Sequence, residues 1–230
     1  MPAAGIATLP SVFKSRFFEG LAPRDIEVIR ASATERSYLA DSVITNQGHV
    51  ADHMFLLTRG RARYFYITTD GKKTLLLWIT PGEFLGGAAF LCSPSEYLLS
   101  TEAIKDSSFL VWDRTTIRSL AAKYPRMLEN ALLMGSDYLA WYLADHVALV
   151  CHTARERLAQ VLIHLARVIG QKVPGGVEFD VTNEELASAA NITPFTASRL
   201  LSQWQTDRAI VKRRGKILVH SPERLLLRVV

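Results

Sequence analysis

Residues 181–204, VTNEELASAANITPFTASRLLSQW, predict two short helices joined by a tight turn. Thr182 and Glu185 have the spacing of a capping box, in which each side chain pairs with a backbone N–H at the start of the first helix. Asn191 falls where the turn needs a residue that tolerates left-handed dihedral angles. Thr193, followed by a proline, suits the cap of the second helix. The stretch therefore predicts a helix-turn-helix.

The second helix of this motif has two unlike faces. Its apolar residues recur at i, i+3, i+4 and i+7, which predicts one buried face: Ala197, Leu200, Leu201 and Trp204. The opposite face is polar and carries Thr196, Arg199 and Gln203. A polar face with an arginine near the start of a helix is what a protein presents to base edges in the major groove. An ordinary pair of packed helices is the alternative that this pattern alone leaves open.

Residues 207–219, DRAIVKRRGKILV, predict two short strands around a basic turn. Gly215 supplies the positive φ that such a turn needs. Arg213, Arg214 and Lys216 make the turn basic. A basic hairpin alone is usually a solvated turn, but beside a recognition helix it predicts a wing.

Charge is unevenly distributed along the chain. Residues 1–150 hold 15 Lys+Arg and 15 Asp+Glu, whereas residues 151–230 hold 12 and 7, so the whole net charge of +5 lies in the C-terminal third. Because duplex DNA is a dense line of phosphate charge, a basic module joined to a neutral one indicates double-stranded DNA as the partner of that module.

The composition predicts a globular protein of two domains, with 230 residues of which 49% are hydrophobic. No apolar run reaches the roughly 20 residues of a membrane helix, so we expect no membrane partner. The N-terminus has no secretory pattern, and two cysteines, Cys92 and Cys151, make no disulfide framework. These features favour a cytoplasmic protein.

The N-terminal half predicts a β sandwich or barrel, preceded by a helix over residues 23–33. Turn residues separate the expected strands, and Gly60 divides the first two of them. The strands are 53–58, 61–67, 73–79 and 107–112.

From Tyr124 to about Cys151 the spacing of the apolar residues becomes that of an α-helix. One set of residues has the 4, 3 spacing of a coiled-coil seam: Leu128, Leu132, Gly135, Leu139, Tyr142, His146 and Leu149. An adjacent stripe comprises Met127, Ala131, Met134, Tyr138 and Trp141. We expect one face to pack on a second subunit and the other on the chain's own barrel. A helix buried in a single core is the alternative.

This order of parts resembles the Crp/Fnr family of bacterial transcription regulators. The most specific matches are PGEFLG at 81–86, Arg-Leu-Ala at 157–159 and TASRLL at 196–201. The resemblance implies an α+β fold: an N-terminal β-roll similar to cyclic nucleotide-binding domains, a long dimerisation helix and a C-terminal winged helix-turn-helix. It also implies a homodimer on a palindromic promoter site, with RNA polymerase as a further partner. We expect a tail at 1–15, the roll at 16–122, the dimerisation helix at 123–151 and the DNA-binding domain at 152–230.

The resemblance also locates an effector pocket, at Leu85, Gly86, Gly87, Tyr97, Leu98, Tyr142 and Leu143. Members that bind cyclic AMP carry a glutamate where this chain has Gly87 and an Arg-Ser pair where it has Tyr97 and Leu98. Without the arginine, a buried phosphate anion would lack a counter-charge. The sequence therefore predicts a signal other than cyclic AMP and no resident cofactor.

Two other kinds of sensing stay open. The carbon monoxide sensors of the family hold haem through a histidine at the position of Gly87, so haem would need another ligand here, such as His146 at the dimer seam. Thiol sensing would use Cys92 or Cys151.

Along the recognition helix, family members commonly show Arg-Glu where this chain has Pro194 and Phe195. Arg199 could pair bidentately with a guanine, whereas Phe195 offers an apolar contact for a thymine methyl. We expect a half-site that keeps the guanine contacted by Arg199 and differs from the family's usual half-site next to it. The predicted DNA contacts are Thr193, Pro194, Phe195, Thr196, Ser198, Arg199, Gln203, Arg213, Arg214 and Lys216.

Two other classes of protein fit the sequence less well. An enzyme is not expected, because the sequence holds no nucleophile elbow, phosphate-binding P-loop or metal-ligand spacing. A ligand-binding module without DNA function is disfavoured by the helix-turn-helix and the basic hairpin.

Overall fold

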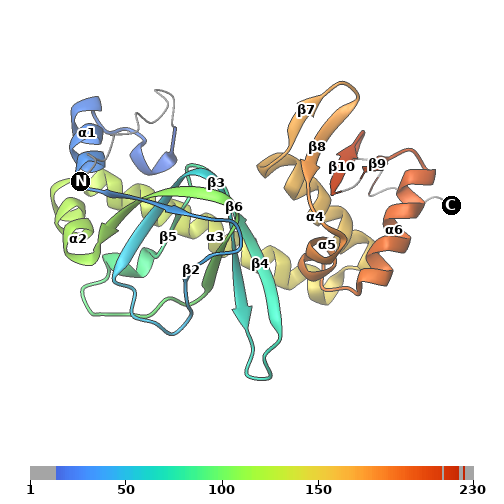
Figure 1. Ribbon diagram of the computed structural model, residues 1–230, viewed down its shortest axis with the longest axis horizontal. Coiled ribbons are helices and arrows are strands. Elements are labelled where there is room, and N and C mark those ends of the chain that lie inside the picture. The colour runs from blue at the N-terminus through green and yellow to red at the C-terminus, as the bar shows by residue number, and fades with distance from the viewer. Residues whose placement is uncertain (1–13, 214, 223–224, 226–230) are drawn as a thin grey trace, which may run out of the picture. The chain divides into compact units, whose positions relative to one another are not determined.

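The computed structural model describes residues 14–213, 215–222 and 225. The chain forms two compact units (Figure 1). The first holds residues up to Tyr64 and Trp78–Tyr138; the second holds Phe65–Leu77 and the chain from Leu139 onward. Helix α3, Pro125–Cys151, contributes residues to both. All but two residues of the expected tail lie outside the described residues.

An antiparallel sheet of six strands, in the order β1-β6-β3-β4 with β2 on β6 and β5 on β3, makes up most of the first unit. The end of β3 and most of β4 fall within Phe65–Leu77, which is grouped with the second unit. Helices and short 3₁₀ turns flank the strands in the chain. The elements are η1 (Arg16–Phe18), α1 (Pro23–Ala31), β1 (Thr34–Tyr38), β2 (Val43–Thr45), β3 (His53–Ile67), β4 (Lys73–Ile79), β5 (Phe84–Leu85), η2 (Gly87–Phe90), β6 (Ser100–Asp113) and α2 (Arg114–Lys123).

Strand β3 corrects the sequence prediction, because Gly60 does not divide it. The glycine keeps a φ of 95° inside one continuous strand of 15 residues. A Cβ at this position would lie 2.3 Å from the Ser107 hydroxyl on β6. Gly60 therefore lets two long strands approach closely, a role that glycine has inside strands as well as between them. Strand β6 is likewise longer than the predicted 107–112, while β4 has the predicted bounds.

Two apolar clusters hold the first unit together. One contains Phe17 and Trp112 and receives Met127, Ala131 and Met134 from α3. The indole N–H of Trp112 donates to the Ile29 carbonyl over 2.9 Å, which satisfies the polar atom of this buried ring. Three residues of the predicted second stripe, Met127, Ala131 and Met134, thus pack on the chain's own core, as expected. Trp141 departs from the prediction, because it is 39% exposed and belongs to the second unit.

The other cluster fills the sheet interior with Phe55, Leu57, Leu85 and Phe109, among others. Three tyrosines, Tyr38, Tyr64 and Tyr97, pack against it.

The second unit contains the helix-turn-helix and a second antiparallel sheet, in the order β7-β8-β10-β9. The sequence reading did not predict β7 and β8. The elements are α4 (Ala154–Val168), β7 (Gln171–Val173), β8 (Gly176–Asp180), α5 (Asn183–Ala189), α6 (Pro194–Thr206), β9 (Ile210–Arg213) and β10 (Lys216–Val219).

The local features predicted for the helix-turn-helix are confirmed. Thr182 and Glu185 form a capping box at the start of α5. Asn191 adopts a φ of 48°, so the turn does use a left-handed residue. On α6 the buried residues are Ala197, Leu200, Leu201 and Trp204. Among the described residues, no helix is long and apolar enough to span a membrane.

Helix α4 carries a mostly buried histidine, His164, in contact with a tryptophan. The ring centroids of His164 and Trp141 are 4.0 Å apart. Neither ring nitrogen of His164 has a hydrogen-bond partner among the described residues. Burial, with a smaller effect of the Arg167 charge, lowers the pKa of His164 to about 4. The ring is therefore neutral at pH 7.

The second unit should lose stability in mild acid because of His164. A histidine whose folded pKa lies below its unfolded value contributes fully above the unfolded pKa, and this contribution is lost as the pH falls toward the folded pKa. Between pH 7.5 and pH 5 the expected loss is about 2 kcal/mol of unfolding free energy. Urea unfolding of wild type and His164→Leu at both pH values measures it. An equal loss in the variant would assign the acid sensitivity to other groups.

Candidate DNA-binding site

The start of helix α6 presents an unusual side chain to solvent. Thr193 caps the helix by accepting a hydrogen bond from the Thr196 N–H over 3.1 Å, and Pro194 occupies the first position. Phe195 follows with 79% of its surface exposed. A large apolar ring is seldom left so open, and here it stands beside polar residues at a helix N-terminus.

Arg199 and Gln203 follow Phe195 along α6 at intervals of one helical turn. Both are exposed, whereas Thr196 and Ser198 are half-buried. On the opposite face, Trp204 is fully buried, and the Arg155 guanidinium lies 5.0 Å from the centre of its ring. The buried face anchors α6 in the unit and leaves the strip of Phe195, Arg199 and Gln203 available for contact.

Arg157 fixes the turn before α6. Its guanidinium donates to the Ala190 carbonyl over 2.9 Å, to the His152 carbonyl over 2.9 Å and to the Asn191 carbonyl over 3.3 Å. These oxygens follow the ends of α5 and α3, where helix carbonyls lack partners within the helix and favour a cation. Arg157 therefore ties the turn of the helix-turn-helix to the end of α3.

The predicted wing is present as the hairpin of β9 and β10. Gly215 has a φ of 70° in its turn. Both described basic side chains at the turn are partnered: Arg213 lies 3.4 Å and Lys216 lies 3.1 Å from carboxylate oxygens of Glu178 on β8. The hydrogen bond to Glu178 raises the pKa of Lys216. Arg214 lies outside the described residues.

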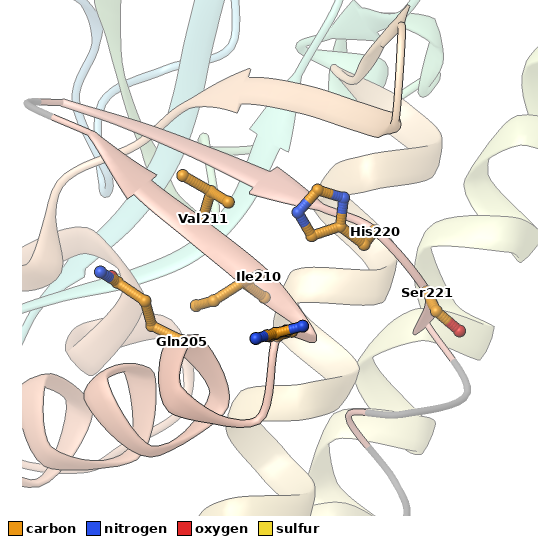
Figure 2. A pocket seen from close by; sticks show the side chains of 6 residues that line it. Gln205, Ile210, Val211, His220 and Ser221 are labelled. Carbon is orange, nitrogen blue, oxygen red and sulfur yellow. The ribbon is translucent and has the colours of Figure 1, made fainter.

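Two open pockets flank these elements. The first, of about 270 Å³, lies between the wing and the residues that begin α5. Three of its lining residues are the cations Lys212, Arg213 and Lys216. The second, of about 620 Å³, is lined by Gln205, Arg208, Ile210, Val211, His220 and Ser221 (Figure 2). It lies at the end of α6 opposite to Phe195, so it takes no part in the exposed strip.

Three of the predicted effector residues, Leu85, Gly86 and Tyr97, lie together beside β3, whereas Leu98 does not join them. Leu85 is buried in the sheet interior, and Gly86, with a φ of 80°, passes so close to β3 that a Cβ would lie 2.4 Å from the His53 carbonyl oxygen. The Tyr97 hydroxyl donates to that same carbonyl over 2.9 Å, so Tyr97 joins its loop to β3. Leu98, in contrast, is 82% exposed.

The other predicted effector residues have separate environments. Gly87 opens η2, where a Cβ would approach the Phe84 ring. Tyr142 and Leu143 belong to the second unit. The Tyr142 hydroxyl is buried and has no hydrogen-bond partner among the described residues, and burial raises its pKa to about 12. Leu143 is exposed.

The side chains considered for thiol or haem sensing lie at the surface. Cys92 and Cys151 are free thiols, and His146 is exposed on α3. Within the described part of the chain, no three His, Cys, Asp or Glu side chains gather as a metal site would require.

Helix α3 carries an exposed apolar face. Of the seventeen large hydrophobic residues exposed in the described chain, eight lie on this helix. They include three of the seam positions, Leu132, Leu139 and Leu149, whereas Leu128 packs on the first core. The others are Leu133, Trp141, Leu143, Val147 and Val150.

A β-roll, a long helix and a winged helix-turn-helix with an exposed recognition strip define a class of DNA-binding regulator. Residues 156–228 match the Crp-like helix-turn-helix domain, and residues 35–124 match the cyclic nucleotide-binding domain. The chain belongs to the Crp/Fnr family of DNA-binding transcription regulators, whose members are not enzymes.

Relatives and solved structures support the assignment. The Cyclic AMP receptor protein of Thermus thermophilus is 27% identical over 81% of this chain and 84% of its own. The Nitrogen fixation regulation protein FixK of Azorhizobium caulinodans is 25% identical over 99% of this chain and 91% of its own. The structure of FixK2 from Bradyrhizobium japonicum shares the fold, with a TM-score of 0.74 at 24% identity over 84% of this chain and 95% of that one.

Proposed function

We propose that this regulator is a cytoplasmic homodimer that reads a palindromic promoter site and works with RNA polymerase. A signal other than cyclic AMP acts on its β-roll, and no tightly held cofactor is required. The exposed strip of Phe195, Arg199 and Gln203 on α6 is the observation that carries the base-reading part of this proposal.

Base reading follows from the chemistry of that strip. An arginine fork pairs with the two acceptors of a guanine, and an exposed phenyl ring suits the methyl group of a thymine. Phe195 and Arg199 are one helical turn apart, so they would contact neighbouring base pairs. At the position where family members commonly carry a glutamate, this chain has Phe195, which offers no hydrogen-bond acceptor to the amino group of a cytosine. This position therefore favours thymine over cytosine.

Dimerisation follows from the exposed face of α3. The face is apolar over several turns and carries the heptad spacing of a two-stranded coiled coil. Two copies packed along it would place their recognition helices about one turn of DNA apart, as a palindromic site demands.

The effector differs from that of the cyclic AMP receptor among the relatives. Tyr97 and Leu98 stand where cyclic AMP-binding members hold the phosphate with Arg-Ser. The Tyr97 hydroxyl is bonded to the His53 carbonyl, and a phenol carries no positive charge to balance a phosphate. An uncharged signal molecule suits this lining better than an anion does.

Cyclic AMP should not bind to the protein in the usual manner. Isothermal titration of the full chain with cyclic AMP is expected to give no heat of binding at millimolar ligand, because the anion would be buried without a counter-charge. The cyclic AMP receptor of Thermus thermophilus serves as the positive control. Saturable binding at micromolar ligand would contradict the assignment.

Leu139→Glu should convert the dimer into a monomer. Leu139 is 60% exposed in the single chain, so the change leaves folding intact but buries two carboxylates at the seam. Light scattering after gel filtration measures the mass. Leu39→Glu, at a 73% exposed leucine that is not part of α3, is the matched control and should remain dimeric. A dimer in both variants would place the interface elsewhere.

Arg199→Ala should weaken binding to the preferred site by about 1–3 kcal/mol and relax the preference at one base pair in each half-site. Fluorescence anisotropy with single-base variants of that site resolves this preference. Arg199→Lys keeps the charge but not the fork, so it should lose preference while retaining more affinity. A loss of equal size on all sequences would make Arg199 a phosphate contact.

A further inference from the structure

Glu178 lies where it can control how the wing meets DNA. It is on β8, and only 18% of its side chain is exposed. Its two carboxylate oxygens face different cations, Oε1 toward Arg213 at 3.4 Å and Oε2 toward Lys216 at 3.1 Å. The two described cations at the tip of the wing thus share a single acid.

The strand register holds this cluster on one face of the sheet. Lys216 on β10 is paired with Arg213 on β9 and with Asp180 on β8, and residues paired across antiparallel strands point to the same side. Asp180 adds a second carboxylate, 3.7 Å from the Lys216 ammonium. Glu178 lies two residues before Asp180 on β8 and so points to the same side, which places these four side chains on one face of three neighbouring strands.

Arg213 and Lys216 are also among the residues expected to contact DNA. They line the open pocket beside the start of α5, and their side chains are 65% and 50% exposed. A carboxylate and a phosphate present similar oxyanions to a guanidinium or an ammonium. Exposed ion pairs are individually weak, so a polyanion can displace them.

We propose that Glu178 competes with DNA phosphate for Arg213 and Lys216 and so restrains the affinity of the wing for DNA. When the wing approaches the duplex, the two cations exchange the carboxylate for phosphate oxygens. The carboxylate then remains beside the DNA as an uncompensated negative charge. This inference rests on the proposed DNA-binding function and on the DNA contact predicted for Arg213 and Lys216.

Glu178→Gln removes the negative charge of the side chain and keeps its shape, so the variant protein should bind DNA more tightly than wild type. The probe is a fluorescein-labelled duplex of random sequence, titrated with the full chain at low and at physiological salt. The expected gain over wild type is about three- to tenfold, since two weak pairs no longer compete. Circular dichroism melting establishes that both proteins are folded.

Two comparisons separate this competition from a general change of charge. Glu184→Gln removes an exposed acid that lines the same pocket, and it should give a smaller gain. In a background of Arg213→Gln and Lys216→Gln the gain from Glu178→Gln should vanish, while that from Glu184→Gln should persist.

If wild type binds the duplex and Glu178→Gln binds it with equal affinity, the proposed competition is overturned, while the DNA-binding function still stands. A gain that survives in the background without Arg213 and Lys216 would overturn it as well. Wild type that fails to bind the duplex at low salt would overturn the proposed wing contact itself.

Discussion

Burial of one face of α6 is the constraint on which the reading surface depends. Ala197, Leu201 and Trp204 lie fully inside the second unit, so the helix cannot rotate about its axis without exposing them. Exposing such side chains would cost several kcal/mol, far more than a polar contact to DNA returns. Arg199 and Phe195 therefore face outward as a consequence of packing on the other side. The Arg157 bonds to the preceding turn fix where the helix begins.

The net positive charge of the second unit does not mean that each of its cations is available to DNA. Counting residues predicts a surface of free cations, but Glu178 and Asp180 partner two of those at the wing, and Arg157 is used within the protein. Arg199 is an exposed cation on α6, the helix that we propose reads bases. In the proposed function, electrostatic attraction brings the module to DNA, and a small set of outward side chains determines the sequence that it prefers.

Much of this could be predicted from sequence because the determinants were local. The capping box of Thr182 and Glu185, the left-handed Asn191 and the positive φ of Gly215 depend on neighbours along the chain, and the structure contains all three. The sequence predicts a turn at Gly60, because Ser107, the residue that requires a glycine there, is far away in sequence. The pairing of Glu178 with the wing is beyond sequence prediction for the same reason, since it depends on the tertiary pairing of β8 with β10. The exposure of Leu98 likewise follows from tertiary structure, which apolar composition alone does not reveal.

Selection of binding sites from a random duplex library by the full-length protein tests the central claim most directly. The account predicts an enriched palindrome whose half-sites are one DNA turn apart, each with an invariant guanine and with thymine favoured beside it. A single asymmetric motif, or no enrichment above the input library, would contradict a dimer that reads bases through Arg199 and Phe195.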